Sequence, residues 1–340
     1  MSKTFDVAVV GGTGAVGATL IELLAEREFP VGKLHVLASS RSAGETVLFR
    51  NRPVMVADAA DFDFAQVQLA FFAAGGTVAA ELAPKAAAAG CIVIDKSSHF
   101  RQDPDVPLVV PEVNAEALAG YTKRNIIACP NCSTIQVAVA LKPLYDAVGV
   151  ERVNVATYQS VSGAGKAGIE ELAKQTAELL NGRGAKPKVF PRQMAFNVLP
   201  QIDAFTDNGY TKEEMKMVWE TRKIFADEEI QVNPTCVRVP VFHGHSVALH
   251  VETGKPITRE EARKLFKKAP GITLVDELKP GGYATPVSEA SGKDSVYVSR
   301  VRQDISYPCG LDLWVVADNL RKGAALNSVQ IAEILVKDYL

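Results

Sequence analysis

The stretch FDVAVVGGTGAVG, residues 5–17, decides the fold of this chain. Its first six residues form an apolar run that is typical of a buried parallel strand. The glycine-rich part satisfies the pattern G-x-G-x-x-G from Gly12 to Gly17, and a helical pattern continues through Leu24. Glycines in such a turn let the backbone approach a pyrophosphate, which binds at the helix N-terminus. The stretch therefore predicts a dinucleotide site; the alternative is a tight turn without a ligand.

The pattern of a strand followed by a helix repeats along the first 130 residues. This alternation indicates right-handed crossovers and a parallel sheet covered on both faces, which is an α/β domain. The other expected elements are strands at 34–38, 69–73, 91–95, 108–110 and 126–128, and an alanine-rich helix at 78–89.

Beyond about residue 150 the pattern changes to longer strands, which indicates a second, α+β domain. A Gly/Lys/Pro stretch at 181–187 predicts an exposed loop, and the run TREE at 258–261 is a capping box that opens a helix. A C-terminal helix at 327–340 is expected to pack back on the first domain. The other expected elements are strands at 153–158, 235–241, 246–252, 296–302 and 311–316, the second and third paired around a turn, and an amphipathic helix at 169–180.

Length and charge limit the classes of protein to which the chain can belong. Its 340 residues are too many for one ordinary core, which indicates two domains. The 37 basic and 39 acidic residues give a net charge of −2, so no nucleic-acid or membrane partner is expected. No apolar run approaches the ~20 residues of a membrane span, and the N-terminus lacks the pattern of a signal peptide.

The five cysteines form an odd, scattered set, at positions 91, 129, 132, 236 and 309. Cys129 and Cys132 have the spacing of a metal-binding pair, but no second pair follows, so no metal site is expected. Reduced thiols are the natural state of such a set, which predicts a cytoplasmic protein.

The run CPNCST, residues 129–134, follows the apolar segment 126–128 and precedes a helical pattern that ends near Val148. Cys132 is thereby placed near a helix N-terminus, where backbone N–H groups and the helix dipole favour a thiolate that attacks carbonyl carbon. Combined with a nicotinamide site, this nucleophile indicates a dehydrogenase that handles an aldehyde or acyl group through a thioester. The alternative is a small buried residue, as most free cysteines are.

The second expected strand ends in the polar run SSRS, residues 39–42. An NAD enzyme usually has an Asp or Glu there to hold the ribose 2′-OH, whereas these hydroxyls and the Arg41 guanidinium suit a 2′-phosphate. NADP is therefore predicted over NAD; an exposed polar loop is the alternative.

Three other places carry residue types that suit acyl transfer. Arg101 follows the strand at 91–95 and could clamp a phosphate, or be a solvated surface arginine. The run SGAGK at 162–166 lacks two residues that a P-loop requires and predicts a glycine loop leading into a helix. Gln159, just before that loop, could orient an acyl oxygen or a water.

The run RVPVFHGH, residues 238–245, supplies a cation for a carboxylate and a histidine for acid–base work. Arg238 and His245 stand at either end of one expected hairpin. A structural histidine is the alternative for His245, and spacing does not exclude the other histidines, at 35, 99, 243 and 250.

Taken together, these runs resemble the aspartate-β-semialdehyde dehydrogenases, and the resemblance covers essentially the whole chain. Matching blocks in the right order are highly specific. The blocks are GGTGAVG (11–17), SSRSAG (39–44), DKSSHFR (95–101), PNCSTIQ (130–136), YQSVSGAGKAG (158–168), AFNVLPQID (195–203), EEMKMVWETRKI (213–224), RVPVFHGHS (238–246) and DNLRKGAA (318–325).

The resemblance implies a reaction: L-aspartate 4-semialdehyde, phosphate and NADP+ form from 4-phospho-L-aspartate and NADPH. This reaction lies on the route to lysine, methionine, threonine and diaminopimelate. Cys132 would be the nucleophile that forms a thioester, His245 the acid–base residue, and Gln159 the residue that orients the thioester or a water. Arg238 would hold the substrate α-carboxylate and Glu213 its α-amino group.

The same resemblance assigns positions for phosphate and for NADP(H). For Glu213 and Lys216, an ordinary surface pair on a helix is the alternative. The phosphate positions are Arg101, Asn131 and Lys216. The NADP(H) positions are Gly12, Thr13, Gly14, Ala15, Val16, Ser39, Ser40, Arg41, Ser42, Gly163 and Asn319.

The fold that the resemblance implies is α/β, with two domains. A Rossmann-type NADP-binding domain at 1–131 would be completed by a C-terminal helix at 320–340. An α+β catalytic and dimerisation domain with a large mixed sheet would occupy 132–319. A homodimer that acts on a small-molecule substrate is expected.

Two other functions stay open on the sequence. An N-acetyl-glutamyl-phosphate reductase or a glyceraldehyde-3-phosphate dehydrogenase shares the chemistry and architecture, although an N-acetylated substrate offers no ammonium to Glu213. A catalytically silent, nucleotide-binding paralogue would be expected to lose at least one of Cys132, Gln159, Arg238 and His245, and all four are present.

Overall fold

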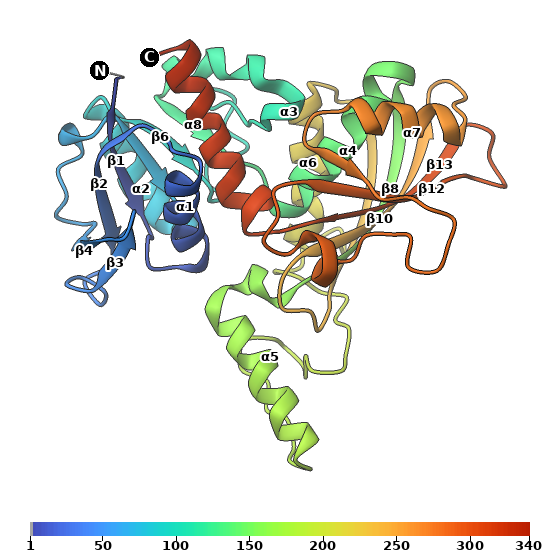
Figure 1. Ribbon diagram of the computed structural model, residues 1–340, viewed down its shortest axis with the longest axis horizontal. Helices are drawn as coiled ribbons and strands as arrows, with labels where there is room; N and C mark the ends of the chain where they lie inside the picture. Colours follow the sequence, from blue (N-terminus) through green and yellow to red (C-terminus); the bar gives the residue numbers. More distant parts are fainter. Residues whose placement is uncertain (1–2) are drawn as a thin grey trace. The chain divides into compact units, whose positions relative to one another are not determined.

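A computed structural model describes residues 3–340 and divides the chain into two compact units. The first unit contains the chain up to Asn131 together with Ala324–Leu340, and the second contains Cys132–Gly323. Each unit has its own sheet, as Figure 1 shows by the blue and the green-to-orange strands. Among the described residues, no helix is long and apolar enough to cross a membrane.

The first unit is a seven-stranded sheet in the order β3-β4-β2-β1-β5-β6-β7. All neighbouring strands are parallel except β3, which forms an antiparallel hairpin with β4 that the sequence did not indicate. The predicted Rossmann-type parallel sheet is confirmed. Its strands are β1 (Phe5–Val10), β2 (Val31–Ala38), β3 (Thr46–Phe49), β4 (Arg52–Asp58), β5 (Leu69–Phe72), β6 (Ile92–Asp95) and β7 (Ile126–Ala128). Its helices are α1 (Ala15–Glu26), α2 (Gly76–Ala88), α3 (Pro111–Asn114) and α8 (Leu326–Asp338).

The strand predicted at 108–110 is wrong. Leu108 makes only an isolated bridge to Ala128, and α3 begins at Pro111. The Val110 N–H donates to the side chain of Asn114 at 2.9 Å, and Asn114 in turn donates to the Leu108 carbonyl at 2.9 Å. These local side-chain bonds replace the ladder that the apolar run alone suggested.

The C-terminal helix α8 supplies part of the first unit's core. Its buried face includes Leu326, Val329 and Leu335, which join one cluster with residues of β1 and α1. Asn327, also buried, donates to the Val109 carbonyl at 3.0 Å. The end of the chain is thereby fixed to the unit that contains its beginning.

The second unit is a mixed six-stranded sheet in the order β11-β12-β13-β10-β8-β9. Helices α4, α6 and α7 pack on one face of this sheet, and α5 projects from it as a separate arm (Figure 1). The predicted large mixed sheet is confirmed. Its strands are β8 (Val150–Gln159), β9 (Gln231–Arg238), β10 (His245–Thr253), β11 (Ile272–Leu274), β12 (Val296–Gln303) and β13 (Gly310–Ala317). Its helices are α4 (Cys132–Val148), α5 (Gly165–Leu180), α6 (Lys212–Phe225) and α7 (Arg259–Lys268), with short helical turns η3 (Val161–Ala164) and η4 (Pro286–Ala290). The turn η5 (Arg321–Ala325) contains the last residues of this unit and the first residues of the C-terminal segment of the other.

The hairpin predicted between 235–241 and 246–252 is wrong. β9 pairs in parallel with β8, and β10 pairs antiparallel with β8 and β13, so β8 lies between the two supposed partners. The six residues from Val239 to Gly244 therefore cross over one strand instead of making a tight turn. As a result, Arg238 and His245 flank the end of β8.

The glycine turn after β1 is too crowded for larger side chains. A Cβ atom on Gly17 would lie 2.2 Å from the Gly11 carbonyl oxygen, and one on Gly12 would lie 2.4 Å from Val36. We expect Gly17→Ala to destabilise the protein by about 1–3 kcal/mol, because overpacking distorts a buried turn, and to weaken NADPH binding. Thermal unfolding and a fluorescence titration with NADPH test this.

The matched control is Gly76→Ala at the first position of α2, where the nearest atom to an added Cβ is 3.9 Å away. That variant should unfold and bind NADPH like the parent. A Gly17→Ala protein with unchanged affinity and stability would show that the turn tolerates a side chain.

Candidate active site

Cys132 is the first residue of α4, as the sequence predicted. Helix N-termini concentrate unpaired N–H groups and the positive end of the dipole, so a thiolate there is stabilised. Gly323 lies against it, because a Cβ on Gly323 would be 3.0 Å from the Cys132 Cβ. The cysteine is partly exposed, unlike the fully buried Cys236, so it is accessible to a substrate.

Three strand ends bring the predicted catalytic residues Gln159 and His245 together with Arg238, the predicted carboxylate-binding residue, on the helix-covered side of the sheet. Gln159 ends β8 and is the register partner of Arg238, the last residue of β9. His245 begins β10, whose next residue pairs with Tyr158 of β8. The side chains of Gln159, Arg238 and His245 are all buried. Residues far apart in the sequence thus meet because their strands are neighbours.

Arg238 is a buried cation whose charge is balanced within the second unit. Burial chiefly lowers its pKa, and the charges of Glu213 and of the Cys132 thiolate raise it. The reciprocal effect is that the guanidinium favours the thiolate. Its Nη1 donates to the Ser160 carbonyl at 2.8 Å. Gly163 permits this placement, because a Cβ there would lie 2.8 Å from Nη1 of Arg238.

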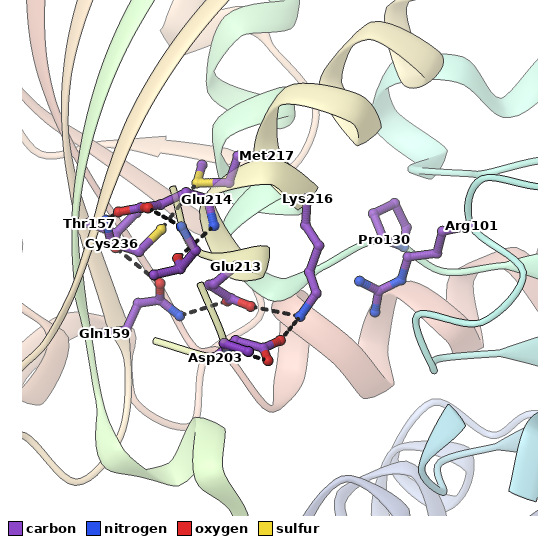
Figure 2. Close-up of polar contacts among 12 residues, drawn as sticks. Arg101, Pro130, Thr157, Gln159, Asp203, Glu213, Glu214, Lys216, Met217 and Cys236 are labelled. Atoms are coloured by element: carbon purple, nitrogen blue, oxygen red, sulfur yellow. Dashed lines mark hydrogen bonds and ion pairs between the residues drawn. The ribbon is translucent and has the colours of Figure 1, made fainter. Parts of the chain in front are cut away.

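Glu213 is a buried carboxylate at the centre of a chain of polar contacts that Figure 2 shows. Its carboxylate accepts hydrogen bonds from Gln159 Nε2 and from Lys216 Nζ, both at 3.1 Å. Lys216 also donates to Asp203 at 2.8 Å. Burial acts to lower the pKa of Lys216, but Glu213 and Asp203 outweigh it and raise that pKa, so the ammonium stays charged.

The helix that carries this chain is anchored at its first turn. Thr211 and Glu214 form a capping box at the start of α6, and Glu214 also accepts the Cys236 N–H at 2.9 Å. The helix start is therefore fixed to β9. The interpretation of Glu213 and Lys216 as an ordinary surface pair is wrong for Glu213, whose exposed fraction is 6 %.

His245 is fully buried, and its two ring nitrogens have different surroundings. Nδ1 accepts the Ser160 N–H at 3.0 Å, whereas Nε2 has no hydrogen-bond partner among the described residues. Burial, and secondarily the charge of Arg238, lower the pKa of His245 to about 3, against smaller opposing effects of Glu213 and the Gly244 backbone. The ring is therefore neutral at physiological pH.

This depressed pKa couples His245 to stability. Between pH 6.5 and about 3 the unfolded chain binds a proton at this position and the folded protein does not, so the free energy of unfolding falls as pH falls. The contribution is at most about 1.4 kcal/mol per pH unit. We expect His245→Gln to show a flatter dependence of unfolding free energy on pH below 6.5, measured by urea unfolding.

His243→Gln, on the same loop, is the matched control and should keep the slope of the parent protein. Equal slopes in the parent and in His245→Gln would mean that His245 is protonated in the folded state.

The residues predicted to bind the dinucleotide phosphates lie at the end of β1. Gly14 is the exposed N-cap of α1 and makes no side-chain cap, and a helix N-terminus binds anions through its first N–H groups. In this turn Gly14 is exposed, whereas the crowded Gly12 and Gly17 are buried beneath it. The polar residues 39–42 follow β2, and Arg41 is exposed there. This arrangement fits a dinucleotide.

Arg101 and Asn131, the predicted phosphate positions of the first unit, are both buried. Arg101 donates through Nε to the Cys129 carbonyl at 2.9 Å and through Nη2 to the Lys96 carbonyl at 2.8 Å. The alternative of a solvated surface arginine is therefore wrong. These bonds fix the guanidinium beside the segment that leads to Cys132.

Sequence reasoning missed three residues of the second unit. Ser160 and Ser162 connect His245 to Asn319, and Asp203 holds Lys216. The only available signal was position, since Ser160 directly follows Gln159 and Asp203 ends the matching block 195–203.

Comparisons with known proteins agree along both units. Residues 6–121 match the family described as "Semialdehyde dehydrogenase, NAD binding domain", and residues 141–322 match "Semialdehyde dehydrogenase, dimerisation domain". The aspartate-semialdehyde dehydrogenase of Legionella pneumophila is 61% identical over 340 residues, which cover 100% of this chain and 98% of the relative. That of Aquifex aeolicus is 52% identical over 99% of both.

Among solved structures, aspartate semialdehyde dehydrogenase II of Vibrio cholerae, complexed with ASA, superposes with a TM-score of 0.98. It is 61% identical, with all of both chains covered. A probable aspartate-semialdehyde dehydrogenase from Pseudomonas aeruginosa has a TM-score of 0.95 at 40% identity, over 99% of this chain and 100% of that chain. The chain therefore belongs to the semialdehyde dehydrogenase family, as an aspartate-semialdehyde dehydrogenase.

Proposed function

We propose that the chain catalyses the NADPH-dependent reductive dephosphorylation of 4-phospho-L-aspartate to L-aspartate 4-semialdehyde, through a thioester on Cys132. The observation that carries this proposal is the placement of Cys132 at the start of α4, in the same unit as the buried cation Arg238, whose charge favours a thiolate. The product serves lysine, methionine, threonine and diaminopimelate biosynthesis.

The acyl-transfer step follows from the charges of the second unit. The Cys132 thiolate attacks the acyl phosphate carbon, and the C–O bond to phosphate breaks to leave the thioester. Gln159, whose amide is fixed between Thr157 and Glu213, orients the acyl group. His245 presents its unpartnered Nε2 for the acyl oxygen.

Substrate recognition uses one cation and one carboxylate that are buried together. Arg238 holds the α-carboxylate, because a guanidinium matches that group bidentately. Glu213 holds the α-ammonium. Lys216, Arg101 and Asn131 bind the phosphoryl group. A free amino acid therefore fits this site better than an N-acetylated one.

NADP(H) supplies the hydride when it is bound. The turn from Gly12 to Val16 and the start of α1 would hold its pyrophosphate, and the polar run 39–42 its 2′-phosphate. Gly163 and Asn319 complete the proposed cofactor set from the second unit. The NADP-binding domain of this proposal is 1–131 with the C-terminal helix 320–340, and the catalytic domain is 132–319.

The test is the reverse reaction, phosphate-dependent formation of NADPH from aspartate semialdehyde and NADP+. Activity that requires phosphate supports the proposal. Activity with N-acetyl-glutamate semialdehyde in its place would make the chain an N-acetyl-glutamyl-phosphate reductase. Binding of NADP+ without turnover of any aldehyde would leave a silent nucleotide-binding paralogue.

A homodimer through the uncovered face of the second unit's sheet belongs to this proposal. That face carries Trp314 and the exposed Tyr158, and a shallow cavity of about 410 Å³ is lined by Ala248, Tyr283 and Trp314. Large aromatic side chains on an open sheet face are typical of a subunit interface. A cytoplasmic location also belongs to the proposal, because the five cysteines form no disulfide within the part of the chain that the structure describes.

We expect Ala248→Arg to convert the dimer to monomers. Ala248 lies between Ala156 and Trp314 in the sheet, so a long cation there would meet its symmetry mate in an isologous interface. Sedimentation velocity measures the change. Met55→Arg, on an exposed position of β4, should leave the dimer intact; a dimeric Ala248→Arg protein would place the interface elsewhere.

A further inference from the structure

The ammonium group of Lys216 is shared by two carboxylates that differ in burial. Its Nζ donates to Asp203 Oδ2 at 2.8 Å and to Glu213 Oε2 at 3.1 Å. The side chain of Glu213 is 8 % exposed, whereas that of Asp203 is 38 % exposed. Figure 2 shows Lys216 in contact with both. The lysine therefore connects a buried carboxylate to one that meets solvent.

Asp203 is held in place by the loop that leads into α6. Its φ of +70° lies in the left-handed region, which Asp and Asn tolerate better than most residues. Its Oδ1 accepts the Ala204 N–H at 2.8 Å, and the Ala204 carbonyl accepts the Lys212 N–H at 2.8 Å. Lys212 is the first residue of α6, and Lys216 lies one turn further along that helix. The loop thus brings the second oxygen of Asp203 to the lysine.

The charges of this group do not cancel. Burial acts to raise the pKa of Asp203, but the ammonium of Lys216 and the Ala204 N–H outweigh burial and lower that pKa, so the carboxylate is charged at neutral pH. Two carboxylates and one ammonium give the group a net charge of −1. Without Asp203, the charges of Lys216 and Glu213 would balance each other.

On the basis of the proposed function, we propose that Asp203 is a positioning residue that shares the Lys216 ammonium with Glu213, so that Glu213 keeps negative charge for the α-ammonium of the substrate. The positive charge of that ammonium then completes the balance of the group. Arg238 is balanced separately by the α-carboxylate. Asp203 thereby favours a substrate with a free amino group through Lys216 and without contact of its own.

Phosphate binding separates this role from a merely structural one. Lys216 is also one of the residues proposed to bind the phosphoryl group, and Asp203 competes with phosphate for its ammonium. Removal of the Asp203 charge should therefore weaken the binding of the amino acid and should not weaken the binding of phosphate. Damage to the loop or to α6 would weaken both.

The first test is Asp203→Asn, which removes the charge and keeps the size of the side chain. In the phosphate-dependent assay we expect KM for aspartate semialdehyde to rise about threefold to tenfold, because Asp203 is partly exposed and solvent screens its charge. We expect kcat to stay within about twofold of the parent, because the lost interaction acts on ground state and transition state alike. KM for phosphate should stay the same or fall.

Asp207→Asn is the matched control, since Asp207 is an exposed aspartate on the same loop. It makes the same change of charge and should leave both KM values as in the parent. Unchanged KM for aspartate semialdehyde in Asp203→Asn would refute the proposal. A rise in KM for phosphate would instead make Asp203 a residue that orients Lys216 for phosphate.

The second test compares L-aspartate and succinate, which differ only in the amino group, as competitors of aspartate semialdehyde. Asp203→Asn should reduce the preference for L-aspartate by about threefold to tenfold, the same factor as for KM. An undiminished preference would show that Asp203 has no part in recognising the ammonium.

The third test is a double-mutant cycle with Lys216→Met. If Asp203 acts through Lys216, Asp203→Asn should change KM for aspartate semialdehyde by less than about twofold once the lysine is absent. An equally large effect in both backgrounds would mean that Asp203 binds the ammonium directly. A parent protein without phosphate-dependent activity would refute the proposed function itself, whereas an active parent with an unaffected Asp203→Asn variant refutes only the role of Asp203.

Discussion

Cys132→Ala is expected to abolish phosphate-dependent NADPH formation, with kcat lowered by at least about 10⁴-fold. The thioester cannot form without the thiolate, and no other cysteine can substitute. Cys91 and Cys236 are fully buried, and burial raises the pKa of the Cys91 thiol to about 12, so neither is a nucleophile at neutral pH. The initial rate of NADPH formation measures the loss.

Two further measurements test whether Cys132→Ala loses activity because the nucleophile is absent and not because the fold is damaged. NADPH binding by Cys132→Ala should match the parent, because the dinucleotide turn lies at the end of β1. Cys309→Ala, which removes a free and partly exposed cysteine at the start of β13, should retain activity. Residual turnover of a few per cent in Cys132→Ala would mean that the aldehyde carbon can give its hydride to NADP+ without first forming a bond to Cys132.

The sequence predicted the features that depend on local chemistry. The turn at Gly12–Gly17 and the placement of Cys132 at a helix start follow from the residues within one strand–turn–helix unit. Arg238 and His245 were predicted as site residues, but the hairpin predicted to join them was wrong. Their relative positions depend on β8, which pairs between β9 and β10. That pairing is set by contacts about 80 residues apart, which no local period records.

The hydrogen bonds that connect His245 to Asn319 through Ser160 and Ser162 could not be predicted from the sequence. Ser160 lies 85 residues from His245 and 159 from Asn319, and each of these residues alone is an ordinary polar position in a loop or at a strand end. They become neighbours only because β10 pairs with both β8 and β13 in the sheet. The state of the histidine is therefore a property of the fold, whereas its presence is a property of the sequence.

Arg238→Met is expected to lower kcat/KM by roughly 10²-fold or more, since removing one partner of a buried charge pair costs about 3 kcal/mol or more. Two effects combine. The substrate carboxylate loses its counter-charge, which raises KM, and the Cys132 thiolate loses the neighbouring cation, which lowers the reactive fraction at neutral pH. Arg238→Lys keeps the charge but lacks the guanidinium that donates to the Ser160 carbonyl. Its kcat/KM should therefore lie between those of the parent protein and of Arg238→Met.

The two effects are separable, because alkylation of Cys132 reports the thiolate alone. In Arg238→Met the midpoint of that reaction should move to higher pH, while KM for aspartate semialdehyde rises in the steady-state assay. Arg192→Met, at an exposed position, is the control and should change neither. A raised KM with an unmoved alkylation midpoint would restrict Arg238 to substrate binding, and the N-terminus of α4 would then be sufficient to activate the cysteine.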